Sequence, residues 1–396
     1  MNFLLSAGEA SGDTYGAQLV EALRQLAPDA NFFGMGGEKM RAAGCDLLVH
    51  ANEVAVVGLV EVLTHLPGIR RRFKHLVAEA AQRKPDAAVL IDFPDFNLRL
   101  ARELHRLGIP VFYFVSPQVW AWRSGRVKQI KKYVRKMIVI FPFEQDFYKQ
   151  HGVDVCYVGH PLAYAPAPQI SREEFAAKYG LNAEKQWIAL LPGSRKKEVR
   201  LNLPVILEAA ALLQKQGTDF EYVLPVASTL DHEWLRAQLA ASQLPIKLTD
   251  NARATLMHAR AGVVASGTAT VEAALAGTPF VVVYRLAPLT WLLGRRLVRL
   301  DTFAMPNLIA GSLIAGRKIV PELIQGGFTP ETVVRELAKI LPDGPARKQM
   351  LADIQQVQGL LRDRPDAGAP VARAAQEITD SLKKTAVYGR GRFNAF

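Results

Sequence analysis

FLLSAGEASGD, residues 3–13, decides the fold class, because a short apolar run there enters a glycine-punctuated turn and a helical pattern follows. The stretch IALLPGSR, residues 188–195, has the same order of features in the second half of the chain. A strand, a tight turn and a helix N-terminus direct backbone N–H groups and a positive dipole end at one place, which suits a carboxylate or a phosphate. Two such halves predict two nucleotide-type domains that face each other across a cleft.

Length, charge and cysteine content are consistent with this organisation. The 396 residues favour two domains of ordinary size. Lysine and arginine number 49 against 37 aspartates and glutamates, a formal charge of +12, which predicts anionic partners such as nucleic acid, phospholipid or phosphorylated small molecules. Cys45 and Cys156 have neither CxxC spacing nor clustered histidines. The composition therefore supports neither a disulfide framework nor a structural zinc site, and it fits a reducing cytoplasm.

Polar residues interrupt the two segments that most resemble a leader or a membrane span. Glu9 and Asp13 interrupt the first apolar run before a signal-peptide core can form. Residues 261–284 are the most apolar stretch, but Glu272 and Pro279 divide it into a strand, a helix and a second strand. We expect a soluble or peripheral protein.

Short apolar runs alternate with helical patterns along the chain, which is typical of parallel βαβ units. We expect strands at residues 2–6, 31–34, 87–92, 111–115, 137–141 and 156–158 in the first half, and at 187–191, 222–225, 246–249, 261–265 and 280–284 in the second. Helical patterns follow at 333–341, 346–361 and 371–384. The fold class is α/β, with two Rossmann-like parallel-sheet domains and a helical C-terminal segment.

Proline-rich residues 161–168 lack both periodicities and predict the domain boundary. We expect an N-terminal domain over 1–163, a linker over 164–168, a C-terminal domain over 169–365, and a helix with a basic tail over 366–396 that packs back on the first domain. GMGG, residues 34–37, is too short and wrongly placed for a dinucleotide fingerprint, and we interpret it as a turn.

SGTATVEAA, residues 266–274, follows a predicted strand and opens a helix. Hydroxyls can bond phosphate oxygens there, and Glu272 lies one turn into the helix, where it can accept from ribose hydroxyls. A well-capped helix whose glutamate complements the dipole explains the same residues. With the turn at 193–195 in the same half, a nucleotide-diphosphate site is favoured, since α/β sheets gather such turns at the C-terminal edge of their strands.

IDFPDFN, residues 91–97, ends another strand with two carboxylates, and the proline between them constrains the chain sharply. Asp92 can act as a general base at a strand end facing the cleft, or it can simply cap the strand. For Asp95 we favour a helix N-cap.

Three further segments combine apolar or aromatic residues with basic ones. In SPQVWAWR, residues 116–123, the indoles either line the cleft or pack in the core. Residues 56–66 are strongly apolar and run into the basic cluster at 70–74, and residues 289–299 repeat this pairing. An apolar face beside cations suits an interfacial membrane helix, although a core helix with a basic end fits each segment alone.

The motifs taken together closely resemble the lipid-A-disaccharide synthase family, bacterial glycosyltransferases of the GT-B class. They are AGEASGD (7–13), VGLVEVL (57–63), IDFPDFN (91–97), VSPQVWAW (115–122), LLPGSR (190–195), ASGTATVE (265–272) and MPNLIAG (305–311), in the same order from about residue 4 to about residue 325. The resemblance implies transfer of 2,3-diacylglucosamine from its UDP ester to the 6-hydroxyl of 2,3-diacylglucosamine 1-phosphate, with inversion, giving a β-1,6 disaccharide and UDP. It also implies a peripheral protein on the inner face of the cytoplasmic membrane of a Gram-negative bacterium.

The resemblance assigns functions to residues motif by motif. Asp92 would be the catalytic carboxylate. The donor UDP-sugar would be bound by Gly193, Ser194, Arg195, Ser266, Gly267, Thr268, Ala269, Thr270, Glu272 and Asn307. The acceptor side would be lined by Glu9, Ser11, Gly12, Asp13, Gln118 and Trp120. Membrane contact would come from Val60, Leu63, Leu66, Arg70, Arg71 and Arg72. No metal or other cofactor and no nucleic-acid partner is expected, and the resemblance leaves monomer and homodimer open.

One departure and two alternatives accompany this reading. Ile-Ala-Gly is duplicated after Asn307, so we assign no function to Arg317. Another GT-B UDP-sugar transferase or a UDP-sugar epimerase would have a similar second half, and the apolar segment 56–66 is the discriminating feature, since an epimerase with a soluble substrate has no use for it. An RNA- or membrane-binding module without chemistry would account for the charge, but the chain has no aromatic and basic platform of a known RNA-binding type.

Overall fold

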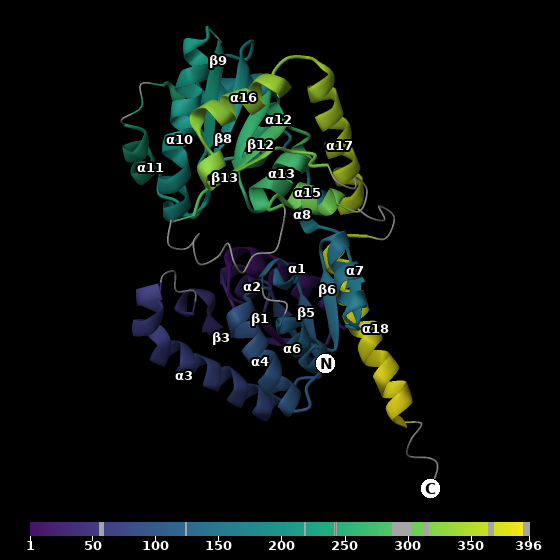
Figure 1. Ribbon diagram of the computed structural model, residues 1–396. Helices are drawn as coiled ribbons and strands as arrows, with labels where there is room; N and C mark the ends of the chain where they lie inside the picture. Colours follow the sequence, from purple (N-terminus) through teal and green to yellow (C-terminus); the bar gives the residue numbers. More distant parts are fainter. Residues whose placement is uncertain are drawn as a thin grey trace. The chain divides into compact units, whose positions relative to one another are not determined.

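In the computed structural model the chain forms two compact units, unit 1 with residues 1–164 and 361–396, and unit 2 with residues 165–360. The structure describes residues 1–54, 59–122, 125–217, 219–240, 242, 244–286, 302–311, 317–362 and 368–390, with the side chains within 59–65, 121–122 and 385–390 left out. Each unit has a sheet flanked by helices (Figure 1), and every pairing among the described strands is parallel.

Unit 1 has a seven-stranded sheet in the order β3-β2-β1-β4-β5-β6-β7. The strands are β1 (Asn2–Ala7), β2 (Asn31–Gly36), β3 (Asp46–His50), β4 (Ala87–Ile91), β5 (Val111–Phe114), β6 (Lys136–Val139) and β7 (Val155–Tyr157). The direction of strand addition reverses between β1 and β4, whose register pairs Ser6 with Leu90. In such sheets ligands bind outside the carboxyl ends of the strands at this switch point.

Helices cover both faces of this sheet, and side chains alternate between two apolar clusters. The helical elements are α1 (Ala10–Leu26), α2 (Glu38–Ala42), η1 (Ala51–Glu53), α3 (Leu59–Arg83), α4 (Pro94–Arg106), α5 (Val119–Trp122), α6 (Arg126–Tyr133), α7 (Pro142–Gln150), α8 (Pro161–Tyr164) and α18 (Pro370–Arg390). Leu4 and Leu90 pack under α3 and α4, whereas Leu5 and Val89 pack with α1 and α18. Alternation with burial on both faces is expected of a covered parallel sheet.

The C-terminal helix α18 is part of unit 1, where it packs along α1. Its residues Ala374 and Ile378 are fully buried in the α1-side cluster. Lys136 of β6 donates a 2.8 Å bond to the carboxylate of Glu377. Helices α1 and α18 therefore lie in the same helical layer, on one face of the unit 1 sheet.

Unit 2 has a six-stranded sheet in the order β10-β9-β8-β11-β12-β13, with its switch point between β8 and β11. The strands are β8 (Gln186–Leu191), β9 (Phe220–Pro225), β10 (Ile246–Thr249), β11 (Ala261–Ala265), β12 (Phe280–Tyr284) and β13 (Glu322–Ile324). The helical elements are α9 (Arg172–Tyr179), α10 (Lys196–Lys215), α11 (His232–Leu239), α12 (Ala252–His258), α13 (Thr268–Ala276), α15 (Met305–Ala310), η2 (Gln325–Gly327), α16 (Pro330–Ile340) and α17 (Pro345–Arg362).

The structure differs from the sequence expectations at four places. The interpretation of residues 34–37 as a turn is wrong, because β2 continues through Gly36. Part of the proline-rich segment forms α8, which begins at Pro161, the helix position where a missing N–H costs nothing. Strands β3 and β13 were not expected, and both are short strands at sheet edges.

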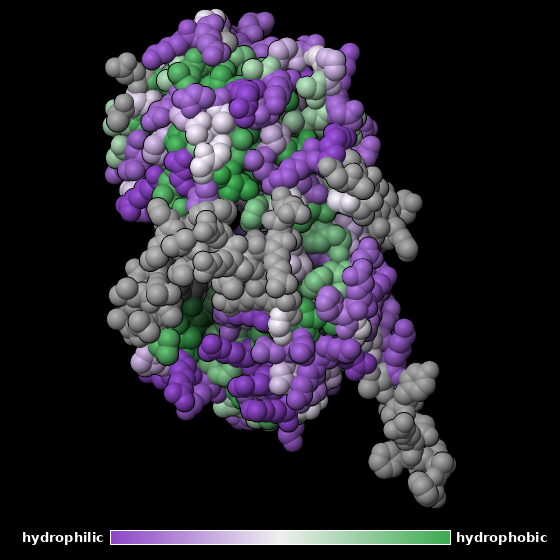
Figure 2. Space-filling model, in the orientation of Figure 1, coloured by the Kyte–Doolittle hydropathy of each residue, from purple (hydrophilic) through white to green (hydrophobic). Residues whose placement is uncertain are grey.

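On the face shown in Figure 2, hydrophilic residues cover much of the described surface of each unit. Within the described part of the chain, no helix is both long enough and apolar enough to cross a membrane.

Candidate active site

The turn after β4 places Asp92 in a constrained backbone. Asp92 and Phe93 have φ values of 45° and 51°, the left-handed region that non-glycine residues rarely adopt. Such residues cost on the order of 1–3 kcal/mol each and cluster at functional sites. Pro94 is the first residue of α4, so Asp95 lies in the first turn of the helix, and its prediction as the N-cap is wrong. The Asp95 carboxylate pairs instead with Arg126.

Buried side chains hold this turn from behind. Tyr113 Oη donates to the Asp92 carbonyl at 2.6 Å, and Asn97 Nδ2 donates to the same oxygen at 2.8 Å. Asn97 also donates to the carbonyls of Ser6 and Ile91 and accepts from Ser6 Oγ at 2.7 Å. The ends of β1 and β4 are therefore joined through one fully buried amide, which sequence reasoning missed although it belongs to the motif IDFPDFN.

The turns that follow β1 and β4 approach each other closely beside Asp92. A Cβ at Gly8 would lie 2.3 Å from the ring of Phe93, so only glycine allows the ring to occupy this place. Glu9 is exposed at the start of α1. Burial, with a contribution from the charge of Glu9, raises the pKa of Asp92 to about 6. A carboxyl group with a pKa near neutrality suits a general base.

The other predicted acceptor-side residues of the first turn divide into two kinds. Ser11 is exposed and Gly12 is buried in the first turn of α1. Asp13 is buried, and its carboxylate accepts from the backbone N–H groups of Gly37, Lys39 and Met40 at 2.7–3.1 Å. Asp13 thus caps α2, which gives it a structural task within unit 1.

The loop after β5 carries Gln118 and Trp120 beside a buried acid. Gln118 is exposed and Trp120 is half-buried. Trp120 Nε1 donates to Glu144 at 3.2 Å, and burial raises the pKa of Glu144 to about 8. The loop begins at Val115, whose φ of 64° is an outlier for a β-branched residue. Glu144 was not found from the sequence.

The predicted membrane-contact residues lie on α3. Leu66 is 50% exposed, and Arg70 and Arg71 are exposed. Arg72 pairs with Glu53 of η1. The side chains of Val60 and Leu63, and all of the second apolar and basic pairing at 289–299, lie outside the described residues.

In unit 2, a carboxylate of the chain itself bonds the backbone of the turn after β8. The carboxylate of Glu198 accepts from the backbone N–H groups of Ser194 and Arg195 at 3.1 and 3.3 Å. Gly193 has a φ of 131°, and a Cβ there would meet Glu198 at 2.6 Å. The amides expected to bind a phosphate are thus already bonded within the unit. The Arg195 side chain is 64% exposed and lies 3.4 Å from Glu198.

The turn after the neighbouring strand β11 differs, because no side chain caps α13. Gly267 has a φ of 142°, which leads the chain into the helix. Ser266 Oγ donates to the Phe303 carbonyl at 3.0 Å and Thr270 Oγ1 to the Gly267 carbonyl at 2.7 Å. These hydroxyls are used inside the unit, which leaves the first amides of α13 and the exposed Thr268 to meet an anion.

Glu272 lies on α13, one turn after these amides. Ala269 is half-buried between Thr268 and Thr270. Burial raises the pKa of Glu272, while the charge of Arg253 opposes this shift. The side chain is therefore a partly desolvated acceptor beside an open helix end.

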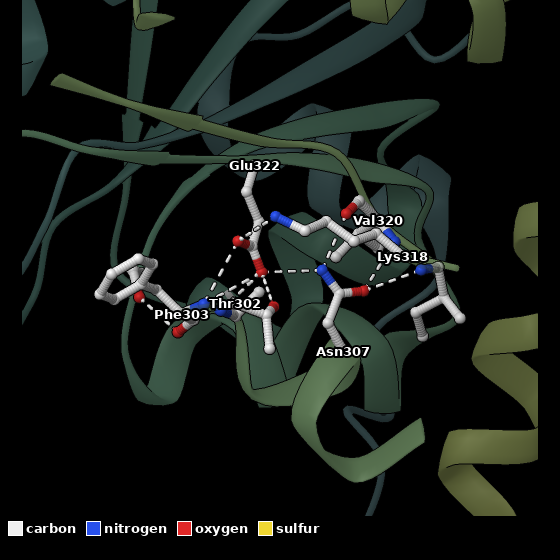
Figure 3. A network of polar contacts seen from close by, with 9 residues as sticks. Thr302, Phe303, Asn307, Lys318, Val320 and Glu322 are labelled. Atoms are coloured by element: carbon white, nitrogen blue, oxygen red, sulfur yellow. Dashed lines mark hydrogen bonds and ion pairs between the residues drawn. The ribbon is translucent and has the colours of Figure 1, made fainter. Parts of the chain in front are cut away.

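Asn307 belongs to a polar network around Glu322, shown in Figure 3. Its Nδ2 donates to Val320 O at 2.9 Å and to Glu322 Oε1 at 2.8 Å. Its Oδ1 accepts from the N–H groups of Ile319 and Val320 at 2.8 and 3.0 Å. The amide is saturated within unit 2, so the described geometry gives Asn307 a positioning task.

Among the residues that the structure describes, no three histidine, cysteine, aspartate or glutamate side chains are grouped so that they could hold a metal ion. Unit 1 thus has an acid at the switch point of its sheet, and unit 2, taken by itself, has a cationic side chain and an uncapped helix N-terminus at the switch point of its own sheet.

Comparisons with known proteins identify the family and the fold of the chain. Residues 3–372 match the family model described as lipid-A-disaccharide synthetase. The lipid-A-disaccharide synthase of Koribacter versatilis is 54% identical over 381 residues, which cover 96% of this chain and 98% of that protein. The enzyme of the same name from Acidobacterium capsulatum is 49% identical over 405 residues, 99% of each. The calicheamicin glycosyltransferase CalG4 superposes with a TM-score of 0.58 at 17% identity, over 97% of this chain and 99% of that one, which supports the GT-B fold.

Proposed function

The chain belongs to the lipid-A-disaccharide synthase family, and we propose that Asp92 of unit 1 and the α13 turn with Arg195 of unit 2 carry its reaction. The protein is an inverting glycosyltransferase that transfers 2,3-diacylglucosamine from UDP-2,3-diacylglucosamine to the 6-hydroxyl of 2,3-diacylglucosamine 1-phosphate. The observation that carries the assignment of the base is the strained turn that places Asp92 at the switch point of the sheet, where burial and the charge of Glu9 raise its pKa to about 6.

Asp92 acts on the acceptor. Its carboxylate takes the proton of the 6-hydroxyl as the oxygen attacks the anomeric carbon of the donor. The bond between that carbon and the diphosphate oxygen breaks, and its electron pair leaves with UDP. A single in-line displacement inverts the anomeric configuration. Glu9, Ser11, Gly12, Gln118 and Trp120 line the acceptor side, and Asp13 supports them by holding α2.

The leaving diphosphate needs positive charge. The uncapped amides at the start of α13, from Gly267 to Ala269, provide N–H groups and a positive dipole end. Arg195, exposed in the neighbouring turn, adds a charge-assisted contact. Glu272 accepts from the ribose hydroxyls.

We propose that no metal ion takes part, since the first amides of α13 and the Arg195 side chain can meet the charge that develops on the leaving diphosphate. Activity that is unchanged by a chelator and by added Mg²⁺ supports this; activity that a chelator abolishes and Mg²⁺ restores contradicts it.

We further propose that α3 contacts the inner face of the cytoplasmic membrane, through Leu66 with Val60 and Leu63 and through Arg70 and Arg71. Both substrates are acylated and anionic, and an apolar stripe beside cations matches an anionic lipid surface.

One experiment tests the function directly. Purified protein is incubated with the UDP and 1-phosphate derivatives of diacylglucosamine in detergent, and products are weighed by mass spectrometry. The disaccharide 1-phosphate and one equivalent of UDP are expected. An isomerised UDP-sugar without disaccharide would assign epimerase chemistry instead.

A further inference from the structure

We propose that Glu322 is a positioning residue for the donor nucleotide: its carboxylate holds residues 302–304 so that the Phe303 carbonyl fixes Ser266 at the start of α13. The inference rests on the proposed donor site and adds a residue that touches no substrate.

The Glu322 carboxylate is buried and surrounded by donors. Its side chain is 0% exposed. It accepts from Ala304 N at 2.9 Å, from Phe303 N at 3.2 Å and from the Thr302 hydroxyl. Contacts from Asn307 and Lys318 at 2.8 and 3.1 Å complete the shell (Figure 3). A buried charge is tolerated only when it is bonded in this way.

The position of this carboxylate in the fold is unusual. Glu322 is the first residue of β13, the three-residue edge strand of the sheet. Ala304 directly precedes α15, so the carboxylate fixes the backbone that leads into this helix through the N–H groups of Phe303 and Ala304. Although burial alone would raise the pKa of Glu322, the bonds from Thr302, Asn307 and Ala304 hold it below its ordinary value. The carboxylate therefore holds these residues in its ionised form.

Residues 302–304, which Glu322 holds, also contact the turn between β11 and α13. Phe303 O accepts from Ser266 Oγ at 3.0 Å, and Ser266 N donates to Val283 O at 2.9 Å. Ser266 therefore sits between β12 and residues 302–304, one residue before Gly267. Because Ser266 gives its only hydroxyl proton to Phe303, its task is to set the direction of the α13 amides.

A carboxylate is required at position 322 because each of the neighbours named above donates to it. In Glu322→Gln, an NH₂ group replaces one oxygen and faces N–H donors of Phe303 and Lys318, so at least one contact is lost and the hold on residues 302–304 is weakened. A small displacement of aligned donors is costly for binding, since hydrogen-bond strength falls steeply with geometry.

Isothermal titration with UDP, together with donor and acceptor kinetics, tests the proposal. For Glu322→Gln we expect the Kd for UDP and the KM for the donor to rise at least about tenfold, with the acceptor KM unchanged. Lys318→Met is the matched control, because Lys318 touches the same carboxylate but is half-exposed and contacts none of residues 302–304; it should bind UDP like the wild type.

A double-mutant cycle separates positioning from loss of fold. Ser266→Ala should weaken UDP binding, and the double variant Ser266→Ala with Glu322→Gln should bind no more weakly than the worse single variant. Additive effects, or wild-type UDP affinity in folded Glu322→Gln, would overturn the proposal. Should Glu322→Gln not fold, Thr302→Val replaces it, and wild-type affinity there has the same meaning. Failure of the wild type to bind UDP would instead contradict the proposed function itself.

Discussion

Tyr113 Oη and the Asp92 carbonyl are joined by a 2.6 Å hydrogen bond from within the sheet. The bond ties the strained residue to β5, the neighbouring strand, so the direction of the Asp92 carboxylate depends on a ring that no substrate reaches. Tyr113→Phe is therefore expected to lower kcat about tenfold to a hundredfold through misplacement of the base, with both KM values little changed.

Tyr222→Phe is the matched control for this prediction. Tyr222 Oη donates to the Ala210 carbonyl at 2.9 Å and is buried in unit 2. Each substitution removes one buried bond worth about 1 kcal/mol, so thermal melts should fall similarly. Equal kcat values for the two variants would refute the role given to Tyr113.

Asp92→Asn should be inactive and more stable. Loss of the base should cut kcat about 10²- to 10⁴-fold with UDP affinity unchanged. The pKa of Asp92 lies at about 6 in the folded protein against an ordinary 3.8, so its stabilising contribution is present below about pH 4 and is lost as pH rises through 6. Removing the charge should gain up to about 3 kcal/mol in urea unfolding at pH 7, and nothing at pH 3.5. A loss of stability at pH 7 would count against this environment for Asp92.

The acceptor kcat/KM should rise with pH through about 6 and then level off, because the base must be ionised. Glu9 contributes to raising this pKa, so Glu9→Gln should move the midpoint to lower pH. Glu103→Gln is a suitable control, since Glu103 pairs with Arg106 on α4; its profile should match the wild type. A midpoint that moves up in Glu9→Gln would reverse the sign of the proposed coupling.

Arg195→Ala should weaken UDP binding by about 1.5–3 kcal/mol, the value of a charge-assisted contact, or roughly 10- to 150-fold in Kd. Arg200→Ala removes a cation one turn further along α10, where Arg200 lies over Trp234, and should leave the affinity unchanged. Similar losses of UDP affinity in both variants would indicate that the net positive charge of this region, and not a specific contact of Arg195, attracts UDP.

Replacing Val60, Leu63 and Leu66 by serine should reduce flotation with anionic phospholipid vesicles and leave the melting temperature nearly unchanged. Leu107→Ser changes another exposed leucine of unit 1, 42% exposed, and should float like the wild type. A large drop in melting temperature in the triple variant would instead place these side chains in the core.

The repeated strand, turn and helix pattern predicted most of the fold because it is local. Eleven expected strands match observed ones within a few residues, since each apolar run ends in glycine, proline or a polar residue. Strands β3 and β13 carry too little local signal: LLV is flanked by charged or polar residues, and β13 begins with the buried Glu322. These two strands form because they pair with the neighbouring strands β2 and β12 at the edges of the two sheets.

The candidate site was predictable where a motif holds the functional residue and its turn together, as at Asp92. What could not be predicted depends on contacts between distant segments. Tyr113 lies 21 residues from Asp92, and Glu322 lies 15 residues from Asn307. Glu198 is only three residues from Arg195. In the sequence it is an ordinary acid in the first turn of a helix, and only the structure shows that its carboxylate accepts from the amides of the preceding turn.

The contrast between α10 and α13 has a consequence for turnover. In the turn before α10 the N–H groups of Ser194 and Arg195 are already bonded to Glu198, whereas no side chain caps the first turn of α13. In the proposed donor site, the product UDP carries the same two phosphates as the donor and would meet the same N–H groups of α13. We therefore expect UDP to inhibit the enzyme as a product that competes with the donor.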